Sequence, residues 1–299
     1  MNNIIETRDL SFSYPGAQGV LDGLNLALPK GSIYGYLGKN GAGKTTTINL
    51  ILKLLPLKNG NIFYNGRDIM PYGNEYFQKV GSLLQPSAMY KHMTPKEQLR
   101  YLSFFYDVDS HNIDKVLVDV GLYEYRNKCI KRLSTGLKQR LAIAMALLHE
   151  PEILILDEPT NGLDPNSVID FRLLISRLNE SGITILMSSH IIGELEKICS
   201  HIGILDNGKL ICQDSMANLQ KESGMALVIR CSDTLKALKL LDINSLIEEG
   251  DNESGFKCQI YGDDDYARII KQLSDNDIDI YNIERERFNL ESYYLKLTN

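Results

Sequence analysis

Residues 38–45 of this chain read Gly-Lys-Asn-Gly-Ala-Gly-Lys-Thr and directly follow the short apolar run 33–37. Backbone N–H groups converge on one anion only where the chain curls tightly, and glycine is the residue that permits such a curl. Residues 45–53 have the composition of a helix, whose amino end would point at the same anion. A strand, a glycine-rich turn and a helix in this order fit the pattern of a loop that binds the phosphates of a nucleotide.

Two side chains of the loop have distinct tasks. The Lys44 ammonium is a mobile positive charge suited to the β- and γ-phosphates, and the Thr45 hydroxyl is suited to Mg²⁺. We therefore expect ATP and Mg²⁺ as the ligands of this loop. The predicted nucleotide contacts are Gly38, Lys39, Asn40, Gly41, Ala42, Gly43, Lys44, Thr45 and Thr46.

A second candidate cluster follows the apolar run 153–156, which reads as a buried strand and ends in Asp157 and Glu158. A carboxylate in this place is suited to hold Mg²⁺, so Asp157 is a predicted metal ligand together with Thr45. Glu158 is one residue further and is suited to polarise the attacking water as a general base. Taken alone, an apolar run that ends in two acids is often just a strand leaving the core, and the phosphate loop upstream favours the catalytic interpretation.

Strands and helices alternate along most of the chain, which predicts a largely parallel α/β core. Residues 94–106, 112–120 and 135–149 read as consecutive helices, so we expect a helical subdomain at about 86–150 within a domain that covers 1–220. Beyond residue 219 the pattern changes, which predicts a smaller α+β domain at 221–299. Hydrophobic residues make up 43% of the chain and charged residues 23%, as in an ordinary globular protein.

The formal net charge is −6, with 38 Asp and Glu against 32 Lys and Arg, which argues against nucleic acid as a partner. Five scattered cysteines without a Cys-x-x-Cys pair predict neither a disulfide framework nor a zinc site. The longest apolar runs are far shorter than the ~20 residues that a membrane span needs. Residues 1–6 lack a basic region followed by an apolar one, so we expect no secretion signal and a cytoplasmic location.

Residues 133–140 read Leu-Ser-Thr-Gly-Leu-Lys-Gln-Arg, where Ser134 can cap a helix beside Gly136 and create a second anion-binding amino end. Between the phosphate loop and the acidic strand, this stretch resembles the signature of the ATP-binding cassette (ABC) ATPases. The resemblance covers about residues 1–220 and implies an ABC-type P-loop NTPase fold, with a parallel core sheet, an antiparallel β subdomain and a helical subdomain. Thr135 and Leu137 depart from the glycine and glutamine usual in the signature.

The resemblance implies roles at four further positions. Gln85 matches the glutamine that touches Mg²⁺ and the water, and His190 matches the switch histidine that would bond the γ-phosphate and orient the attack. Residues 161–164, which end in Asp164, match the family's loop that crosses to a second subunit. Tyr14 matches the aromatic residue that stacks on adenine, with the aromatic residues at 12 and 36 left open as alternatives. The implied catalytic residues are thus Glu158, His190 and Gln85, and the implied metal ligands are Thr45, Gln85 and Asp157.

The family mechanism implies partners. Two cassettes, expected here to be two copies of this chain, pair head to tail, so that Ser134 and Gly136 of one chain face the ATP held by the other. A separate integral membrane permease is expected to dock near residues 85–105. These partners place the chain in the cytoplasm, peripherally on the inner face of the cell membrane.

Within the family, the stretches 81–85, 89–94 and 156–165 and the C-terminal tail look like those of the bacitracin-resistance and lantibiotic-immunity exporters. This predicts an ATPase that energises export of, or immunity to, peptide antibiotics. A generic multidrug or lipid exporter ATPase is the main alternative. A soluble cassette that acts on ribosomes or DNA is disfavoured, because the chain has one set of motifs and the interval 46–132 lacks heptads. The presence of all the chemical residues disfavours a catalytically dead regulatory cassette.

Overall fold

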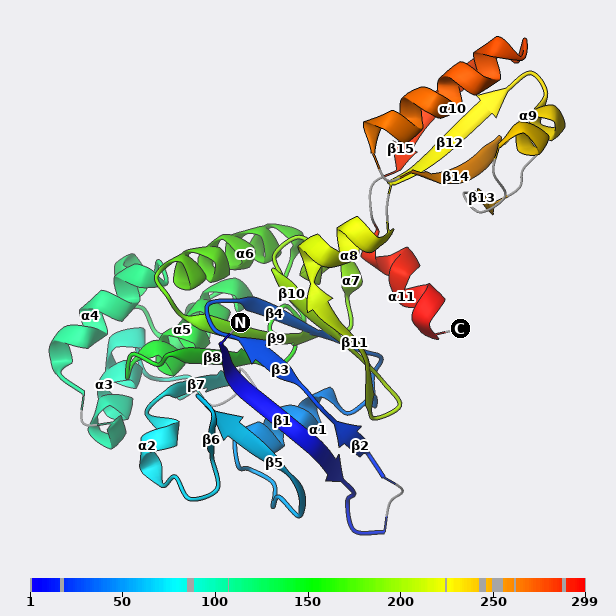
Figure 1. Ribbon diagram of the computed structural model, residues 1–299. Helices are drawn as coiled ribbons and strands as arrows, with labels where there is room; N and C mark the ends of the chain where they lie inside the picture. The colour runs from blue at the N-terminus through cyan, green and yellow to red at the C-terminus, as the bar shows by residue number, and fades with distance from the viewer. Residues whose placement is uncertain are drawn as a thin grey trace. The chain divides into compact units, whose positions relative to one another are not determined.

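The computed structural model describes residues 2–16, 19–84, 89–106, 108–223, 225–241, 246–248, 255–260, 262–286 and 289–298. The chain divides into two compact units, Met1–Asp214 and Ser215–Asn299, and Figure 1 shows the elements of each. The boundary expected at residue 220 falls inside helix α8 (Met216–Ser223), shortly beyond this division. The two units are described separately below.

A six-stranded sheet forms the centre of the larger unit. Its strand order is β11 (Lys209–Ser215), β10 (His201–Asp206), β4 (Ile33–Leu37), β9 (Thr184–Ser189), β8 (Ile153–Leu156) and β7 (Val80–Leu83). The strands from β10 to β7 pair in parallel, and every residue of β4, β8 and β9 is buried. Continuous apolar runs are typical of strands that are covered on both faces, which is why these segments carry no polar alternation.

The parallel arrangement brings the polar residues of three separate motifs to one edge of this sheet. Leu37 pairs with Ser189, and Leu156 pairs with Met187, so the ends of β4, β8 and β9 lie next to one another. The phosphate loop begins directly after β4. The acids Asp157 and Glu158 come directly after β8, and His190 comes directly after β9. The crevice at the carboxyl ends of parallel strands is where open α/β sheets bind their ligands.

A second sheet in the larger unit is built around the long strand β1 (Asn3–Phe12). β1 pairs antiparallel with β2 (Leu21–Leu24), β3 (Ala27–Pro29) and β5 (Asn59–Tyr64), and β5 pairs with β6 (Arg67–Asp68). Side chains from β1, β2, β5 and the central sheet join helix α1 (Lys44–Ile51) in one hydrophobic core. Apolar burial of this kind fixes the phosphate loop, which connects β4 to α1, on a rigid base.

The helices of the larger unit are α1, α2 (Asn74–Phe77), α3 (Pro95–Tyr106), α4 (Ser110–Asp119), α5 (Thr135–Leu147), α6 (Pro165–Glu180) and α7 (Ile192–Leu195), with single 3₁₀ turns at Tyr123–Tyr125 and Ile130–Arg132. α3, α4 and α5 pack on one another and form the group of helices at the left of Figure 1. Side-chain caps set where α4, α5 and α6 begin: Asp109, Ser134 and Asp164 each accept a backbone N–H of the first turn. Such a cap stabilises a helix by about 1 kcal/mol.

The smaller unit holds a four-stranded sheet in the order β13 (Leu246–Glu248), β14 (Phe256–Ile260), β12 (Met225–Cys231) and β15 (Ile280–Glu286). The three pairings are antiparallel, and α9 (Thr234–Leu240) and α10 (Asp263–Asp275) complete a β-α-β-β-α-β sequence of elements. Leu227, Ile229, Phe256, Ile269 and Leu273 are among its buried core residues. This succession and strand order are those of the ferredoxin-like motif, and α11 (Leu290–Thr298) follows it.

Within the described residues, no helix has the length and the apolar character needed to cross a bilayer. None of the five cysteines, all of which lie in the described residues, forms a disulfide bond, and Cys199, Cys231 and Cys258 are buried.

Candidate nucleotide and metal site

The phosphate loop adopts a backbone that only glycine tolerates well. Gly41 and Gly43 have φ angles of 84° and 113°, in the region that favours glycine. At Gly38, a Cβ atom would lie 2.6 Å from the carbonyl oxygen of Leu205, so that position has no room for a side chain. α1 begins at Lys44, immediately after this turn, and its amino end therefore points into the loop.

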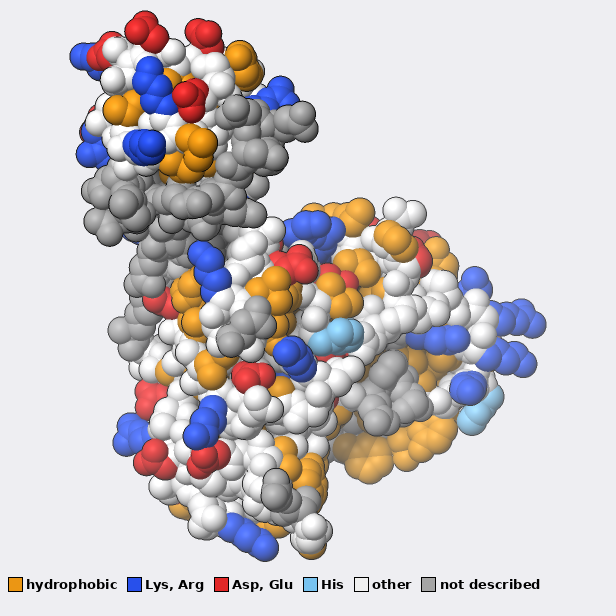
Figure 2. All heavy atoms as spheres, turned by 90° about the vertical axis from the view of Figure 1, so that its right-hand side faces the viewer, with side chains coloured by type: hydrophobic (Ala, Val, Ile, Leu, Met, Phe, Trp, Pro, Cys, Tyr) orange, Lys and Arg blue, Asp and Glu red, His pale blue; other side chains and the backbone are white. Residues whose placement is uncertain are grey.

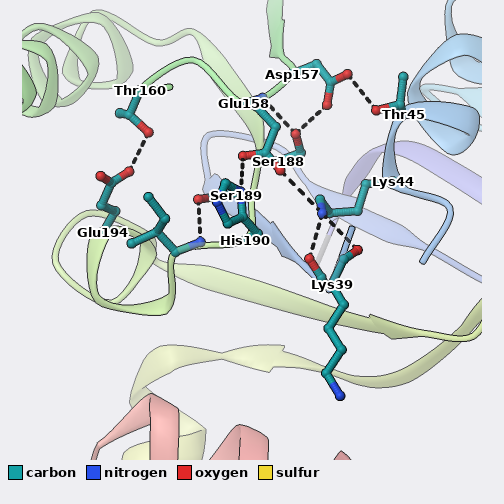
Figure 3. Close-up of polar contacts among 12 residues, drawn as sticks. Lys39, Lys44, Thr45, Asp157, Glu158, Thr160, Ser188, Ser189, His190 and Glu194 are labelled. Carbon is teal, nitrogen blue, oxygen red and sulfur yellow. Dashed lines mark hydrogen bonds and ion pairs between the residues drawn. The ribbon is translucent and has the colours of Figure 1, made fainter. Parts of the chain in front are cut away.

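The Lys44 side chain lies across the loop and is 6% exposed. Its ammonium donates to the carbonyl oxygens of Gly38 at 2.6 Å and Lys39 at 3.2 Å. The same Nζ lies 3.3 Å from Oε1 of Glu158, so the charged end of Lys44 links the loop to the acidic segment after β8 (Figure 3). The predicted anion site therefore has a nearly buried positive charge at its centre.

The two side chains predicted to hold a metal are in direct contact. The Thr45 hydroxyl donates to Oδ2 of Asp157 at 2.8 Å. Both are hard oxygen donors, which fits Mg²⁺. Across the described part of the chain, no group of three or more His, Cys, Asp and Glu side chains could hold a metal ion. The remaining ligands of a magnesium ion here would be phosphate oxygens and water, the set that Mg²⁺ usually takes.

Glu158 and His190 form a pair at the mouth of the site. His190 Nδ1 lies 2.8 Å from Oε2 of Glu158, and the two side chains are 38% and 18% exposed. Glu158 has a φ of 49°, a left-handed conformation that is uncommon for a residue other than glycine. Its carboxylate thus has one oxygen near Lys44 and the other near His190, an arrangement suited to holding a water molecule at the edge of the phosphate site.

Tyr14, the residue predicted to stack on adenine, lies beside the phosphate loop. Its hydroxyl is 3.4 Å from the Thr46 hydroxyl, and its ring meets the Phe12 ring edge to face at 4.9 Å. Phe12 and Tyr36 are buried, whereas Tyr14 is 40% exposed. Of the three aromatic residues considered from the sequence, only Tyr14 is exposed to solvent.

Ser134, Gly136 and Asp164 lie together, but no hydrogen bond between described residues joins them to the phosphate loop. Ser134 caps α5 by accepting the Leu137 N–H at 3.3 Å. A Cβ on Gly136 would lie 2.6 Å from the Ser167 hydroxyl oxygen, and that hydroxyl donates to Asp164 at 2.6 Å. The Ser167 hydroxyl and N–H hold the pKa of Asp164 below its usual range. Ser167 therefore lies next to both the signature turn, residues 134–136, and Asp164 at the end of the loop 161–164.

The predicted contribution of Gln85 lies outside the described residues. The structure adds two residues that the sequence did not single out. Ser188 bonds both Asp157 and Glu158, and Gln139 of α5 donates to the carbonyl oxygen of Pro159. Ser188 precedes His190 by two positions, and this proximity is the one signal in the sequence that could have indicated it.

Comparison with known proteins gives consistent matches. The ABC transporter family profile matches residues 21–161. The bacitracin transport ATP-binding protein BcrA of Bacillus licheniformis is 38% identical over 99% of this chain and 98% of its own length. The lantibiotic transport ATP-binding protein SrtF of Streptococcus pyogenes is 34% identical over 73% of this chain and 95% of its own. Among solved structures, cbiO1 of Clostridium perfringens, part of the ABC transporter complex cbiONQ, has a TM-score of 0.67 at 26% identity, covering 72% of this chain and 89% of its own.

The resemblance and the fold class predicted from the sequence are confirmed by these matches, as is the expected nucleotide chemistry. The similarity to BcrA extends through the smaller unit, because it covers nearly all of both chains. The chain belongs to the ATP-binding subunits of ABC transporters, which hydrolyse ATP to drive transport through a membrane permease.

Proposed function

We propose that this subunit energises a permease that exports a peptide antibiotic or confers immunity to it. The similarity to BcrA along nearly the whole chain supports this substrate class, and the similarity to SrtF points the same way. A generic multidrug or lipid exporter remains the alternative. For ATP hydrolysis itself, the supporting observation is the convergence of Lys44 and His190 on the two carboxylate oxygens of Glu158.

In the proposed reaction, the N–H groups of residues 38–46 and the Lys44 ammonium bind the β- and γ-phosphates. Glu158 accepts a proton from the attacking water, and His190 holds the γ-phosphate and keeps the Glu158 carboxylate oriented. Tyr14 stacks on the adenine. Gln85, outside the described residues, is proposed to contact the metal and the water.

Mg²⁺ would be held by Thr45 and Asp157, with Gln85 as a further proposed ligand. When bound, the ion neutralises charge that develops on the phosphate oxygens. The direct contact between Thr45 and Asp157 supports this assignment, because it puts two oxygen donors within reach of one ion.

A second copy of the chain is proposed to complete each site. The Ser134 and Gly136 turn would face the phosphates bound by the partner, head to tail, with Asp164 in the crossing loop. Support comes from Ser167, whose hydroxyl lies next to Gly136 and donates to Asp164, since the two segments proposed to face the partner are then neighbours. We keep the proposed division into an ATPase domain at 1–220, with its helical subdomain at 86–150, and an accessory domain at 221–299.

The permease is proposed to dock on exposed aromatic residues of α3 and the segment before it. Tyr90 is 44% exposed and Phe105 is 70% exposed, and Tyr101 joins them through edge-to-face ring contacts at 5.5 and 5.3 Å. Hydrophobic side chains gather at the lower right of the larger unit in Figure 2, beneath a group of lysines and arginines. Exposed aromatic residues of this kind are typical of protein interfaces. This docking would hold the subunit at the cytoplasmic face of the membrane.

The test is to purify the tagged chain from membranes and identify the membrane protein that accompanies it. Cells that carry the wild-type chain and this membrane protein should tolerate bacitracin or a lantibiotic better than cells that carry the membrane protein and the Glu158→Gln variant. This variant should bind ATP without hydrolysing it. Tolerance that is equal in the two strains would exclude the antibiotic class, and a purification without any polytopic partner would contradict the docking proposal.

A further inference from the structure

Ser188 lies at the carboxyl end of β9 between the two acidic residues of the site, as Figure 3 shows, and its side chain is fully buried. Its hydroxyl donates to Oδ1 of Asp157 at 2.5 Å. The same hydroxyl oxygen accepts the backbone N–H of Glu158 at 2.9 Å. We propose that Ser188 is a positioning residue for ATP hydrolysis, which fixes the carboxylate of Asp157 toward the metal and the backbone of Glu158 toward the water.

The Ser188 hydroxyl determines which carboxylate oxygen of Asp157 is available to bind the metal. Oδ1 is taken by Ser188, and Oδ2 faces the Thr45 hydroxyl at 2.8 Å. A terminal carboxylate torsion is broad and roughly two-fold, so without a donor on Oδ1 the group can turn and weaken its aim at the metal. Partners that orient a metal-binding carboxylate in this way affect the metal affinity itself.

At Glu158, the hydroxyl supports an unusual backbone. The φ of 49° is a conformation that residues other than glycine keep only where their surroundings impose it. The bond from the Glu158 N–H to Ser188 is such a constraint, and the conformation turns the side chain toward Lys44 and His190. A carboxylate that is out of place by a small distance is a poor base, because proton transfer requires direct hydrogen-bond reach.

The neighbouring serine has a different task. Ser189 is also buried, but its hydroxyl accepts the Ile191 N–H at 2.9 Å, and no bond to either acid is described for it. The two serines before His190 are therefore not equivalent, and the inference applies to Ser188 alone. It rests on the proposed placement of Mg²⁺ between Thr45 and Asp157.

The experiment compares Ser188→Thr, which keeps the hydroxyl, with Ser188→Val, which has the same shape without it. Thr184→Val is the matched control: it removes a buried hydroxyl at the opposite end of β9, where Thr184 accepts the Gly31 N–H at 2.9 Å. For the full-length chain, the binding of the analogue AMP-PNP is measured with Mg²⁺ and with EDTA, alongside kcat and the Mg²⁺ concentration for half-maximal activity.

We expect Ser188→Val to lower kcat and the Mg²⁺-dependent gain in AMP-PNP affinity by about 10- to 100-fold, the usual effect of losing such an orienting partner. Affinity in EDTA should be unchanged, and Ser188→Thr and Thr184→Val should both resemble the wild type. Equal losses in the Val and Thr variants, or equal losses with and without Mg²⁺, would overturn the inference by revealing a packing effect. If the affinity of the wild-type chain for AMP-PNP is the same with Mg²⁺ and with EDTA, the proposed metal site itself is overturned.

Discussion

The side-chain amide of Gln139 donates a hydrogen bond to the carbonyl oxygen of Pro159 at 2.6 Å. Gln139 is 6% exposed and belongs to α5, the helix that Ser134 caps. Pro159 directly follows Glu158. One buried bond thus connects the helix proposed to face a partner's nucleotide with the catalytic segment of its own chain.

We expect Gln139→Leu to destabilise the fold by about 1–3 kcal/mol, because the carbonyl oxygen of Pro159 loses its buried donor, and to lower kcat, because Pro159 directly follows Glu158. KM for ATP should change little, since the phosphate loop is untouched. Steady-state ATPase measurements test this. Asn179→Leu is the control, because Asn179 also donates an amide to backbone carbonyls, of Gly31 and Ile183, away from the site. An equal fall in kcat in both variants would contradict a specific role for Gln139.

We expect Tyr14 to contribute to ATP binding through its ring and not through its hydroxyl. The hydroxyl meets Thr46 at 3.4 Å, which is a long contact, whereas the ring is 40% exposed. Stacking of a base on an aromatic ring contributes about 1–3 kcal/mol, so Tyr14→Ala should weaken ATP binding by about tenfold or more. Tyr14→Phe should bind like the wild type. Titration with a fluorescent ATP analogue measures both, and equal affinities for all three proteins would exclude Tyr14 as the adenine contact.

His149 should make the stability of the chain fall in mild acid. Its ring stacks on Tyr106 at 4.5 Å, and its Nε2 lies 3.3 Å from the carbonyl oxygen of Val80. Nδ1 is buried and has no described hydrogen-bond partner, so a second proton would be poorly accommodated. Burial accordingly lowers the pKa of His149.

The direction in which folding stability changes with pH follows from the difference in proton binding between the folded and unfolded chains. A histidine with a lowered pKa binds its proton more readily in the unfolded chain, so its contribution to stability is complete above the unfolded pKa of about 6.5 and is lost as the pH falls below it. Melting temperatures between pH 8 and pH 5 should therefore decline more steeply for the wild type than for His149→Phe, which keeps the stacking. His201, whose pKa burial also lowers, leaves a residual slope in both proteins. Parallel curves would contradict the prediction.

Gly136→Ala should strain the signature turn. The new Cβ would lie 2.6 Å from the Ser167 hydroxyl oxygen, which already donates to Asp164. Overpacking of this kind costs about 1–3 kcal/mol, so thermal unfolding should shift to a lower temperature. Gly193→Ala is the control, because a Cβ there meets nothing within 4 Å. ATPase activity should fall in the first variant and persist in the second.

Much of the site could be predicted because each motif is local. The loop 38–45 and the pair Asp157 and Glu158 each lie within one strand and the turn after it, and their residue types alone indicate phosphate and metal chemistry. Ser188 and Gln139 could not be identified in this way. Their roles arise from contacts with residues 31 and 20 positions away, respectively, and only the folded sheet brings those residues together.

The fold was likewise predictable where the sequence has a clear pattern of apolar residues. The parallel core follows from the continuous apolar strands. Residues 191–199 also read as a helix in the sequence, but the helix α7 is limited to Ile192–Leu195. There the N–H of Ile198 bonds to Leu195, a tighter turn that ends the regular helix. The pair Asn59 and Gly60 is typical of a turn, but it lies in the first part of β5, where the pairing with β1 changes register. Strand β13 is only three residues long, too short for an alternating pattern to be recognised in the sequence.

The ion pair between Lys44 and Glu158 at 3.3 Å couples two jobs that are usually considered separately. The same ammonium that is expected to grip the triphosphate also occupies the carboxylate expected to deprotonate water. A triphosphate that binds the loop would compete with Glu158 for the Lys44 ammonium, and its binding would leave the carboxylate free to accept a proton from water. We therefore expect the ion pair to keep Glu158 from acting as a base until a triphosphate has bound.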